Sequence, residues 1–486
     1  MRAAPLLLVS IGLLAGCERR PDNVPVVVSA IGEAAVAVDP SRAALSHPAA
    51  VLIGATAQGL VRFDANGQVE PALAERWIVI DDGRSYIFRL RDARWPNGSE
   101  VTAGQVVAAL RRIVADRSRN ALLPQLSVVD EVVEMTPDVI EVRLKRARPD
   151  LLKLFAQPEM AILAPRGLGG TGPFRIQEPG GDGIVLRPVD DPSLLADVEV
   201  EAPNPEQYVR LRAERAALAI ARFAARESDM VSGGTYRDWP LLAAAEIAPT
   251  NRRIDPALGL FGFNIVERTG FLADPANREA VAMAIDRAAL TGAFLPDWPV
   301  AEAVLPEQLD SAAPPARPGW QGFALDDRRT AARVRVDLWR AEQGGAAPSL
   351  RIALPDSAGG RLVWAYVHAS LASVGIDSER VGIGADADLR LIDRVAPHDS
   401  ARWFLVNACR PCAGGVAATI FAAREAPDMQ SRARLIAEAD AALADDHAFI
   451  PLARPLRWSL VALRLRAWRD NARAWHPLNH LRPGTN

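Results

Sequence analysis

The sequence predicts an α/β protein built from more than one compact lobe. Its 486 residues exceed what a single hydrophobic core usually encloses, so two or three lobes are expected. Residues 59–113 have the pattern of a strand meander that leads into a helix, and residues 350–394 alternate strand, helix and strand. The hydrophobic fraction (49%) and the charged fraction (24%) are those of an ordinary globular protein.

The first seventeen residues have the pattern of a signal peptide. Arg2 supplies a short positive region and residues 6–14 are apolar, but this stretch is too short to cross a bilayer about 30 Å thick. Leu14-Ala15-Gly16-Cys17 has the form of a bacterial lipobox, in which the cysteine is acylated and becomes the new N-terminus. We therefore predict that residues 1–17 are a lipoprotein signal peptide and that Cys17 carries a membrane anchor. A plain secretory signal with a chance cysteine is the alternative.

The meander is predicted from its turns and its alternation. Asn66-Gly67 and Asp82-Gly83 are hairpin dipeptides, because both supply residues that tolerate positive φ. Residues 86–91 alternate with the period of a half-buried strand. Thr102 and Gln105 have the spacing of a capping box, which opens a helix over 103–113.

This block resembles the signature of the extracellular solute-binding proteins of peptide-type ABC importers, the family of periplasmic dipeptide- and oligopeptide-binding proteins. The residues that carry the resemblance, in the family's order, are Trp77, Asp82-Gly83, Phe88-Arg89-Leu90-Arg91 and Thr102-Ala103. A generic α+β surface would supply the turns without that order.

Residues 258–290 resemble a second block of the same family. Phe263-Asn264 are expected to end a strand, and Asp274 and Pro275 are suited to the N-cap and first position of a helix that continues over 278–290. Residues 206–230 also have helical spacing and resemble a further family element. The resemblance covers about residues 25 to 465.

The resemblance implies a two-lobed periplasmic-binding-protein fold with a hinge and an extra inserted domain. Lobe I would comprise 18–45, 166–258 and 458–486, the inserted domain 46–165, and lobe II 259–457. A ligand would sit between the lobes and be enclosed by hinge closure.

The peptide-binding members carry Gly-Trp-x-x-Asp-x-x-Asp-Pro-x-x-Phe at the cleft, and the first Asp pairs with the α-amino group of the peptide. The corresponding stretch here is 392–403. Aligning Asp399 with the second Asp and Trp403 with the Phe places Ala396 at the amine-anchor position, and the Gly-Trp pair is missing. This departure weakens the case for recognition of a peptide α-amino group. Our candidate ligand contacts are Asp399, Trp403, Asn264, Trp239 and Asp393.

Three of these candidates have a structural alternative. Asp399 could be a solvated turn residue, Trp403 a core residue, and Asn264 a structural cap. Asp393, like Asp399, is a possible substitute for the missing amine anchor.

Two further cysteines remain, in the sequence Cys409-Arg410-Pro411-Cys412. Outside the cytoplasm we expect a pair this close to form a disulfide, with a redox-active pair as the alternative. Zinc would need two more ligands, and His398 alone does not supply them. We expect no metal and no cofactor.

The function implied is that of a lipid-anchored, monomeric substrate-binding component of an ABC transporter. It would capture a peptide-like or other small solute in the periplasm or cell envelope and deliver it to the permease and ATPase subunits of an inner-membrane importer.

Other classes of function are not indicated by the sequence. The net charge of −3 does not indicate the positively charged surface that binds nucleic acid. The sequence holds no Gly-x-Ser-x-Gly or His-Glu-x-x-His, so no enzyme is predicted. The alternative function is a binding-fold envelope lipoprotein in signalling or assembly, without a transport role.

Overall fold

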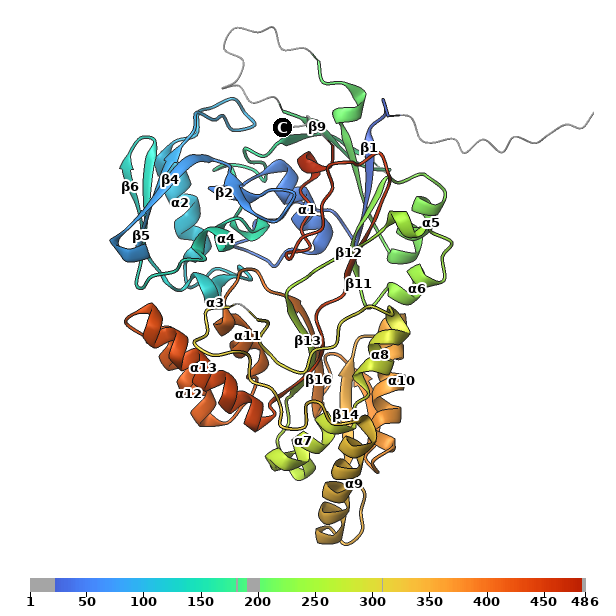
Figure 1. Cartoon of the computed structure of the whole chain (residues 1–486). Helices are drawn as coiled ribbons and strands as arrows, with labels where there is room; N and C mark the ends of the chain where they lie inside the picture. Colours follow the sequence, from blue (N-terminus) through green and yellow to red (C-terminus); the bar gives the residue numbers. More distant parts are fainter. Residues whose placement is uncertain (1–21, 181, 190–201, 308, 483–486) are drawn as a thin grey trace, which may run out of the picture.

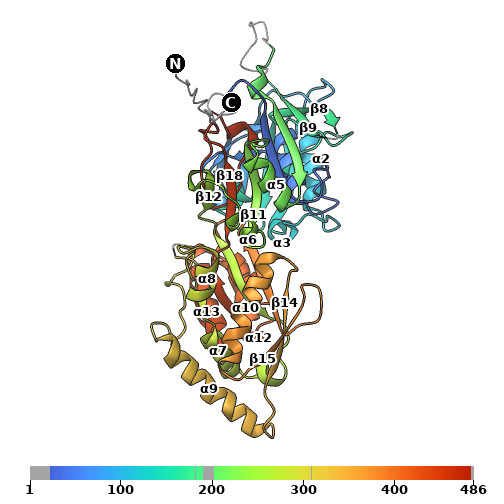
Figure 2. The same cartoon turned by 90° about the vertical axis from the view of Figure 1, so that its right-hand side faces the viewer.

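The protein consists of two α/β bodies stacked end to end. A computed structural model describes residues 22–180, 182–189, 202–307 and 309–482, so the predicted lipobox with Cys17 lies outside the described residues. Figure 1 shows the larger body above and the smaller one below, and the quarter-turn in Figure 2 shows the waist between them. This is the two-lobed architecture that the resemblance implied.

A seven-stranded sheet, which we call the lobe I sheet, forms the centre of the upper body. Its order is β12-β18-β11-β1-β10-β9-β8, and β1 runs parallel to both of its neighbours. Helices α1 (His47–Thr56) and α5 (Ala216–Ala224) pack on opposite faces of it (Figure 1). The strands are β1 (Val26–Ile31), β8 (Phe174–Gly180), β9 (Gly183–Pro188), β10 (Val209–Glu214), β11 (Met230–Thr235), β12 (Arg252–Asp255) and β18 (Arg457–Val461).

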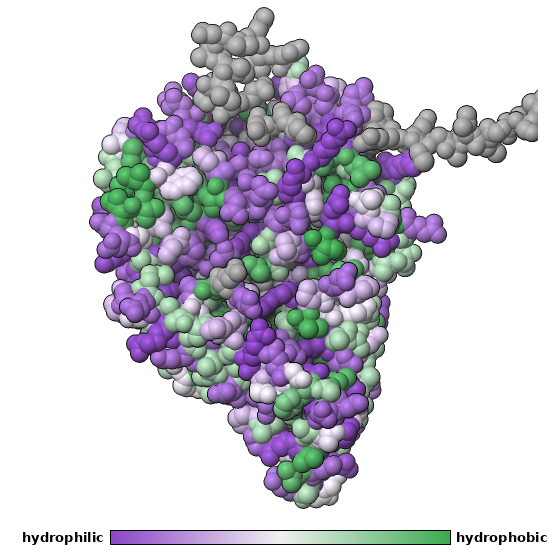
Figure 3. Space-filling model, in the orientation of Figure 1, coloured by the Kyte–Doolittle hydropathy of each residue, from purple (hydrophilic) through white to green (hydrophobic). Residues whose placement is uncertain are grey.

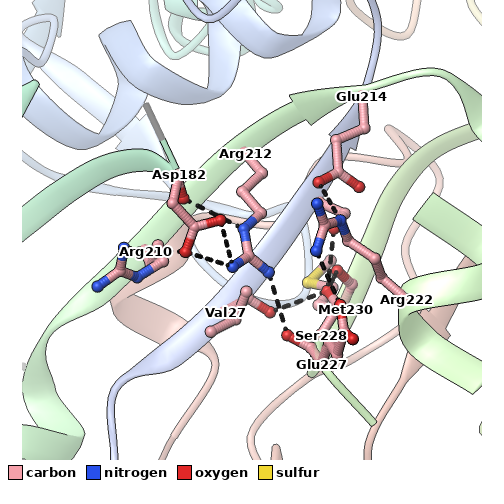
Figure 4. Close-up of polar contacts among 10 residues, drawn as sticks. Val27, Asp182, Arg210, Arg212, Glu214, Arg222, Glu227, Ser228 and Met230 are labelled. Carbon is pink, nitrogen blue, oxygen red and sulfur yellow. Dashed lines mark hydrogen bonds and ion pairs between the residues drawn. The ribbon is translucent and has the colours of Figure 1, made fainter. Parts of the chain in front are cut away.

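The predicted helical spacing over 206–230 is wrong for its first half, because β10 occupies 209–214. Val209 and Leu211 are buried in the sheet, which is the alternation of a strand. Arg212 reaches Asp182 in the β8–β9 turn, with Nη2 and Oδ1 2.7 Å apart, and Arg210 Nη1 lies 3.3 Å from Asp182 Oδ2 (Figure 4). The helix begins only at Ala216.

The second part of the upper body, which we call the insert, is built on a four-stranded sheet in the order β4-β5-β7-β6. Both predicted hairpins are present, with φ of 70° at Gly67 and 85° at Gly83. The capping box of Thr102 and Gln105 is confirmed at the start of α2. The elements are β2 (Val61–Phe63), β3 (Val69–Pro71), β4 (Ala74–Ile80), β5 (Ser85–Leu90), α2 (Ala103–Val114), α3 (Leu123–Leu126), β6 (Val129–Thr136), β7 (Val139–Leu144) and α4 (Leu151–Phe155).

The lower body, lobe II, is built on a five-stranded sheet in the order β15-β14-β16-β13-β17. The predicted strand, helix and strand over 350–394 are β14, α10 and β16, and β15 lies between the last two in the chain. Its strands are β13 (Gly259–Ile265), β14 (Ser349–Leu354), β15 (Asp377–Gly382), β16 (Leu389–Val395) and β17 (Phe449–Ala453). The helices after β13 are α7 (Pro275–Ala284), α8 (Arg287–Phe294), α9 (Leu325–Glu342), α10 (Ala358–Ala372), α11 (Ala401–Ala408), α12 (Gly414–Glu425) and α13 (Met429–Asp446).

The expected helix through 278–290 is divided in two. The side chain of Asp274 accepts a hydrogen bond from Ala276 N at 2.9 Å, which confirms it as the N-cap of α7. Asp286 then accepts from Ala289 N at 2.9 Å and caps α8. A single continuous helix is therefore wrong, because the second cap needs extended backbone at Ile285.

Two short connections join the lobes. Residues 256–258 link β12 to β13, and residues 454–456 link β17 to β18. Asp393 in β16 lies beside the second connection, where its Oδ1 is 2.8 Å from Nη1 of Arg457. Few backbone dihedrals separate the lobes, which is the construction of a hinge.

The surface is mostly hydrophilic. Figure 3 shows hydrophobic atoms gathered at the left of this face, over the insert, where Ile78, Val79 and Met135 are exposed. Within the described ranges, no helix has the length and apolar character needed to cross a membrane.

Candidate functional site

The loop of residues 396–400, between β16 and α11, lies where lobe II meets two segments of the upper body. Gln157, just after α4 of the insert, donates from Nε2 to the carbonyl of Pro397 at 2.6 Å. Arg473, in the segment after β18, donates from Nη1 to the carbonyl of Ala396 at 2.9 Å. The resemblance placed the family's cleft segment at this stretch. Two hydrogen bonds from the upper body therefore hold the backbone of this loop.

Asp399 is bound by two cations of its own chain. Its carboxylate forms ion pairs with Lys153 of α4 and with Arg473. Burial lowers the pKa of Arg473 to about 10, so the side chain remains charged at neutral pH. A ligand ammonium group would have to compete with both cations for this carboxylate. Ala396 is 1% exposed and offers only its backbone.

A cavity of about 410 Å³ lies between the insert and lobe II, next to this loop. Figure 1 shows α3 of the insert above α11 of lobe II, which carry most of its walls. The insert contributes Leu123, Pro124, Gln125, Ser127 and Arg148, and lobe II contributes His398, Ser400, Arg402, Trp403, Val406 and Arg424.

Of the predicted contacts, Trp403 lines the cavity and Asp399 adjoins it. Trp403 is 7% exposed and packs edge-on against Phe404 with ring centroids 5.0 Å apart, so it also belongs to the core of lobe II. Asp399 lies between two residues that line the cavity, His398 and Ser400.

The other three predicted contacts lie elsewhere. Asp393 is paired with Arg457 at the hinge, and burial outweighs that arginine and raises the carboxyl pKa. Asn264 is buried and donates from Nδ2 to the carbonyl of Asn407 at 3.1 Å. Trp239 is buried in the core, and its Nε1 donates to the carbonyl of Phe294. The structure does not bring these three to the cavity.

Arg148 and Arg402 were not among the predicted contacts, and His398 was considered only as a zinc ligand. Arg402 and His398 are near neighbours of the predicted Trp403 and Asp399, which is the one signal that could have drawn attention to them. Nothing in the sequence joins Arg148 to them, because that contact arises from the docking of the insert on lobe II.

Cys409 and Cys412 form a disulfide in the structure, with Cα atoms 4.8 Å apart, at the end of α11. Among the described residues, no group of three or more His, Cys, Asp or Glu side chains could hold a metal ion.

Solved structures of similar fold extend over nearly the whole chain. Haemophilus influenzae OppA in complex with the peptide RPPGFSPFR has a TM-score of 0.75 and 17% identity, with 94% of this chain and 98% of that one covered. The murein tripeptide binding protein MppA of Escherichia coli has a TM-score of 0.75 and 17% identity, over 94% and 97%. NikZ from Campylobacter jejuni in complex with Ni(L-His) has a TM-score of 0.69 and 17% identity, over 91% and 94%.

Matches at the level of sequence are shorter. The chain is 47% identical over 58 residues to the probable deoxycholate-binding periplasmic protein YgiS of Escherichia coli strain K12, or 12% of this chain and 11% of that protein. It is 29% identical over 133 residues to the nickel-binding periplasmic protein of the same strain, or 24% and 25%. The matched segments thus span no more than a quarter of these two relatives.

The family assignment comes from a longer match. Residues 68–385, more than half of the chain, match the family described as bacterial extracellular solute-binding proteins, family 5 (middle part), a family of binding proteins and not of enzymes. Together with the shared two-lobed fold, this match shows that the chain belongs to the family 5 bacterial extracellular solute-binding proteins.

Proposed function

We propose that the protein is the lipid-anchored substrate-binding component of an ABC importer, and that it captures a peptide-like or other small solute between its lobes. The observation that carries this proposal is the cavity of about 410 Å³ between the insert and lobe II of a family 5 binding protein. A volume of this size lies within the range of small-molecule sites, which is about 300–1,000 Å³. Permease and ATPase subunits of an inner-membrane importer would be its partners.

The proposed division of the chain follows the sheets. Lobe I would comprise 18–45, 166–258 and 458–486, the insert 46–165, and lobe II 259–457. This division is supported by the strands of the lobe I sheet, which come from three separate stretches of the chain. Capture would then bring the lobes together by bending at the two connections, 256–258 and 454–456. This requires that the solute bind the closed form better than the open one.

The anchor has its own test. Membranes from cells that produce the chain should contain it in lipidated form, and Cys17→Ser should move it into the periplasmic fraction. Radiolabelled palmitate incorporated into the wild type but not into the variant would support acylation at Cys17. Equal labelling of both would contradict it.

Transport is tested in the native organism. A strain that lacks the gene should leave in the spent medium at least one small solute that the wild type removes, and the gene supplied in trans should restore its removal. The same solute should bind the purified chain. If no solute differs between the strains, the transport proposal is contradicted.

A second candidate is an envelope lipoprotein of the same fold without a transport role. It is favoured by two observations: Asp399 is paired with Lys153 and Arg473, and Ala396 stands at the expected position of the amine anchor. An envelope defect in the deletion strain, with uptake unchanged, would support this candidate over the first.

A further inference from the structure

Positive charge gathers around the cavity between the insert and lobe II. Arg148 lines it from the insert, and Arg402 and Arg424 line it from lobe II. Burial and, after it, repulsion by four other arginines lower the pKa of Arg402 to about 10; these are Arg148, Arg432, Arg424 and Arg146. Four guanidinium groups thus act on that of Arg402, which is itself partly desolvated, and charges interact more strongly there than in water.

Only some of these charges are balanced within the chain. Three arginines have a carboxylate partner: Arg146 with Glu425, Arg424 with the same Glu425 at 3.5 Å, and Arg432 with Asp310 at 3.0 Å. Arg402 donates from Nε to the carbonyl of Ile420 at 3.3 Å, and over the described ranges neither Arg402 nor Arg148 has a carboxylate within ion-pair distance. Arg148 and Arg402, one from each body, thus line the cavity without an ion-pair partner in the part of the chain that the structure describes, although Asp150 and Asp310 attract Arg148 from beyond that distance.

A buried histidine adds an unpartnered polar atom to the same wall. His398 is 3% exposed, and burial lowers its pKa to about 4, so the ring is neutral at pH 7. Its Nε2 lies 3.1 Å from Asp150 Oδ2, while Nδ1 has no hydrogen-bond partner. With the proton on Nε2, the second nitrogen is left as an acceptor. Buried polar atoms without partners are uncommon. As an acceptor, Nδ1 would take a hydrogen from a donor group of a ligand, such as a peptide N–H or a hydroxyl, because an ionised carboxylate has no hydrogen to donate.

We propose that this cavity binds an organic anion, with a carboxylate between Arg148 and Arg402 and an apolar part beside Trp403. This inference rests on the proposed function, because it names the chemistry of the solute that the protein captures. Guanidinium groups match carboxylates in geometry and charge, and form two parallel hydrogen bonds with them. The anion would also remove the repulsion between two like charges.

The remaining walls fit the apolar part of such a ligand. Leu123 and Pro124 of the insert and Trp403 and Val406 of lobe II line the same space. The carboxylate could be the C-terminus of a peptide or that of a free organic acid, and both present the same group to the arginines. An α-amino group is not needed for either, in keeping with the occupied Asp399.

The placement of the two arginines also gives the anion a mechanical role. Arg148 belongs to the insert and Arg402 to lobe II, so without an anion their repulsion opposes the approach of the two bodies. A bound carboxylate attracts both and favours the closed arrangement. This is the differential affinity for two states that ligand-driven closure requires.

Matched probes test the proposal on the full chain purified in detergent. Two pairs differ only in the carboxylate: 3-phenylpropionate with 3-phenylpropionamide, and the dipeptide Ala-Phe with its C-terminal amide. Calorimetry should show that at least one acid binds at least about tenfold more tightly than its amide, or about 1.4 kcal/mol. Binding of 3-phenylpropionate would indicate a free organic acid, and binding of Ala-Phe alone a peptide.

Variants locate the site. Arg148→Gln should weaken binding of the acid at least about tenfold and leave that of the amide unchanged, without lowering the Tm of the ligand-free protein. Arg402→Gln should weaken binding of the acid in the same way. Arg402→Lys keeps the positive charge, and it tests the site should Arg402→Gln fail to fold. Arg434→Gln is the control, since that side chain is 68% exposed on α13.

Two results would overturn the proposal: equal binding of acid and amide, or no binding of either acid up to about 10 mM. The experiments distinguish failure of the anion-site proposal from failure of the proposed transport function. A neutral or cationic solute that the cells import through this protein would refute the anion site alone. Acids that bind while uptake is unchanged in the deletion strain would refute transport alone.

Discussion

Arg457 in β18 and Asp393 in β16 form an ion pair that joins the lobe I sheet to the lobe II sheet. Nη1 of Arg457 lies 2.8 Å from Oδ1 and 3.1 Å from Oδ2 of Asp393, and both side chains are mostly buried, at 15% and 13% exposure. The pair sits directly after the connection of residues 454–456. Any movement of one lobe against the other has this contact near its axis.

Breaking this pair should destabilise the protein strongly. Arg457→Met leaves the Asp393 carboxylate buried without a partner, and we expect a loss of about 3 kcal/mol in the free energy of unfolding. Urea unfolding measures it. The double variant Arg457→Met/Asp393→Leu should recover most of the loss. If the double variant is as unstable as the sum of the two single variants, the residues do not act as a pair.

Removing Lys153 should open the ligand-free protein. Lys153 of the insert pairs with Asp399 of lobe II, so Lys153→Met removes one of the two ion pairs that, among the described residues, join a basic side chain of the insert to a carboxylate of lobe II; the other joins Arg146 to Glu425. Small-angle X-ray scattering should show a larger radius of gyration. Lys145→Met is a matched control, because Lys145 is exposed and its Nζ donates to Ser127 O within the insert. An unchanged radius for Lys153→Met would show that this ion pair does not hold the bodies together.

The protein should lose stability as the pH falls from about 6.5 to about 4. Burial lowers the pKa of His47 to about 4, and that of His398 and His447 likewise. The unfolded chain then binds more protons than the folded chain in this window, so the free energy of unfolding falls there and is unaffected at higher pH.

His47→Gln isolates one of these histidines. Glutamine can still meet the Ser232 hydroxyl, which lies 3.0 Å from Nε2. The loss of stability between pH 7 and pH 4 should shrink by about 3 kcal/mol, as the shift in pKa implies. His368→Gln, which replaces an exposed imidazole on α10, is the control. The same pH dependence in His47→Gln and wild type would refute the assignment.

The disulfide between Cys409 and Cys412 should contribute a modest stabilisation. It closes a loop of four residues, for which the chain-entropy argument gives about 2 kcal/mol. Changing both cysteines to serine should lower the free energy of unfolding by about that amount and leave ligand affinity unchanged. Reductant should then have no further effect. Loss of ligand binding, or thiol exchange with a model disulfide, would favour the redox alternative.

Local signals in the sequence predicted much of the fold. The capping box of Thr102 and Gln105, the Asp82-Gly83 turn and the Asp274 cap act within a few residues, and all three have the expected structure. The prediction of a helix around Arg210 is wrong. The alanine- and arginine-rich residues that follow have helical character, but pairing with β1 and β9 makes the segment around Arg210 a strand. Tertiary context commonly overrides local propensity in this way.

The cavity could not be predicted from the sequence in the same manner. Trp403 was found because the family pattern places an aromatic residue there. Arg148 and Arg402 lie more than 250 residues apart in the chain and meet only because the insert docks on lobe II. The same holds for Lys153 and Asp399, which are 246 positions apart. Contacts between bodies leave no periodicity and no short motif.

The most direct test of the account is native mass spectrometry of the full chain, purified gently from its own envelope. We predict a complex heavier than the protein alone, which loses the extra mass on denaturation and releases a small molecule that carries a carboxylate. No bound species, repeated after incubation with peptide and organic-acid mixtures, would contradict the claim that this protein captures a solute between its lobes.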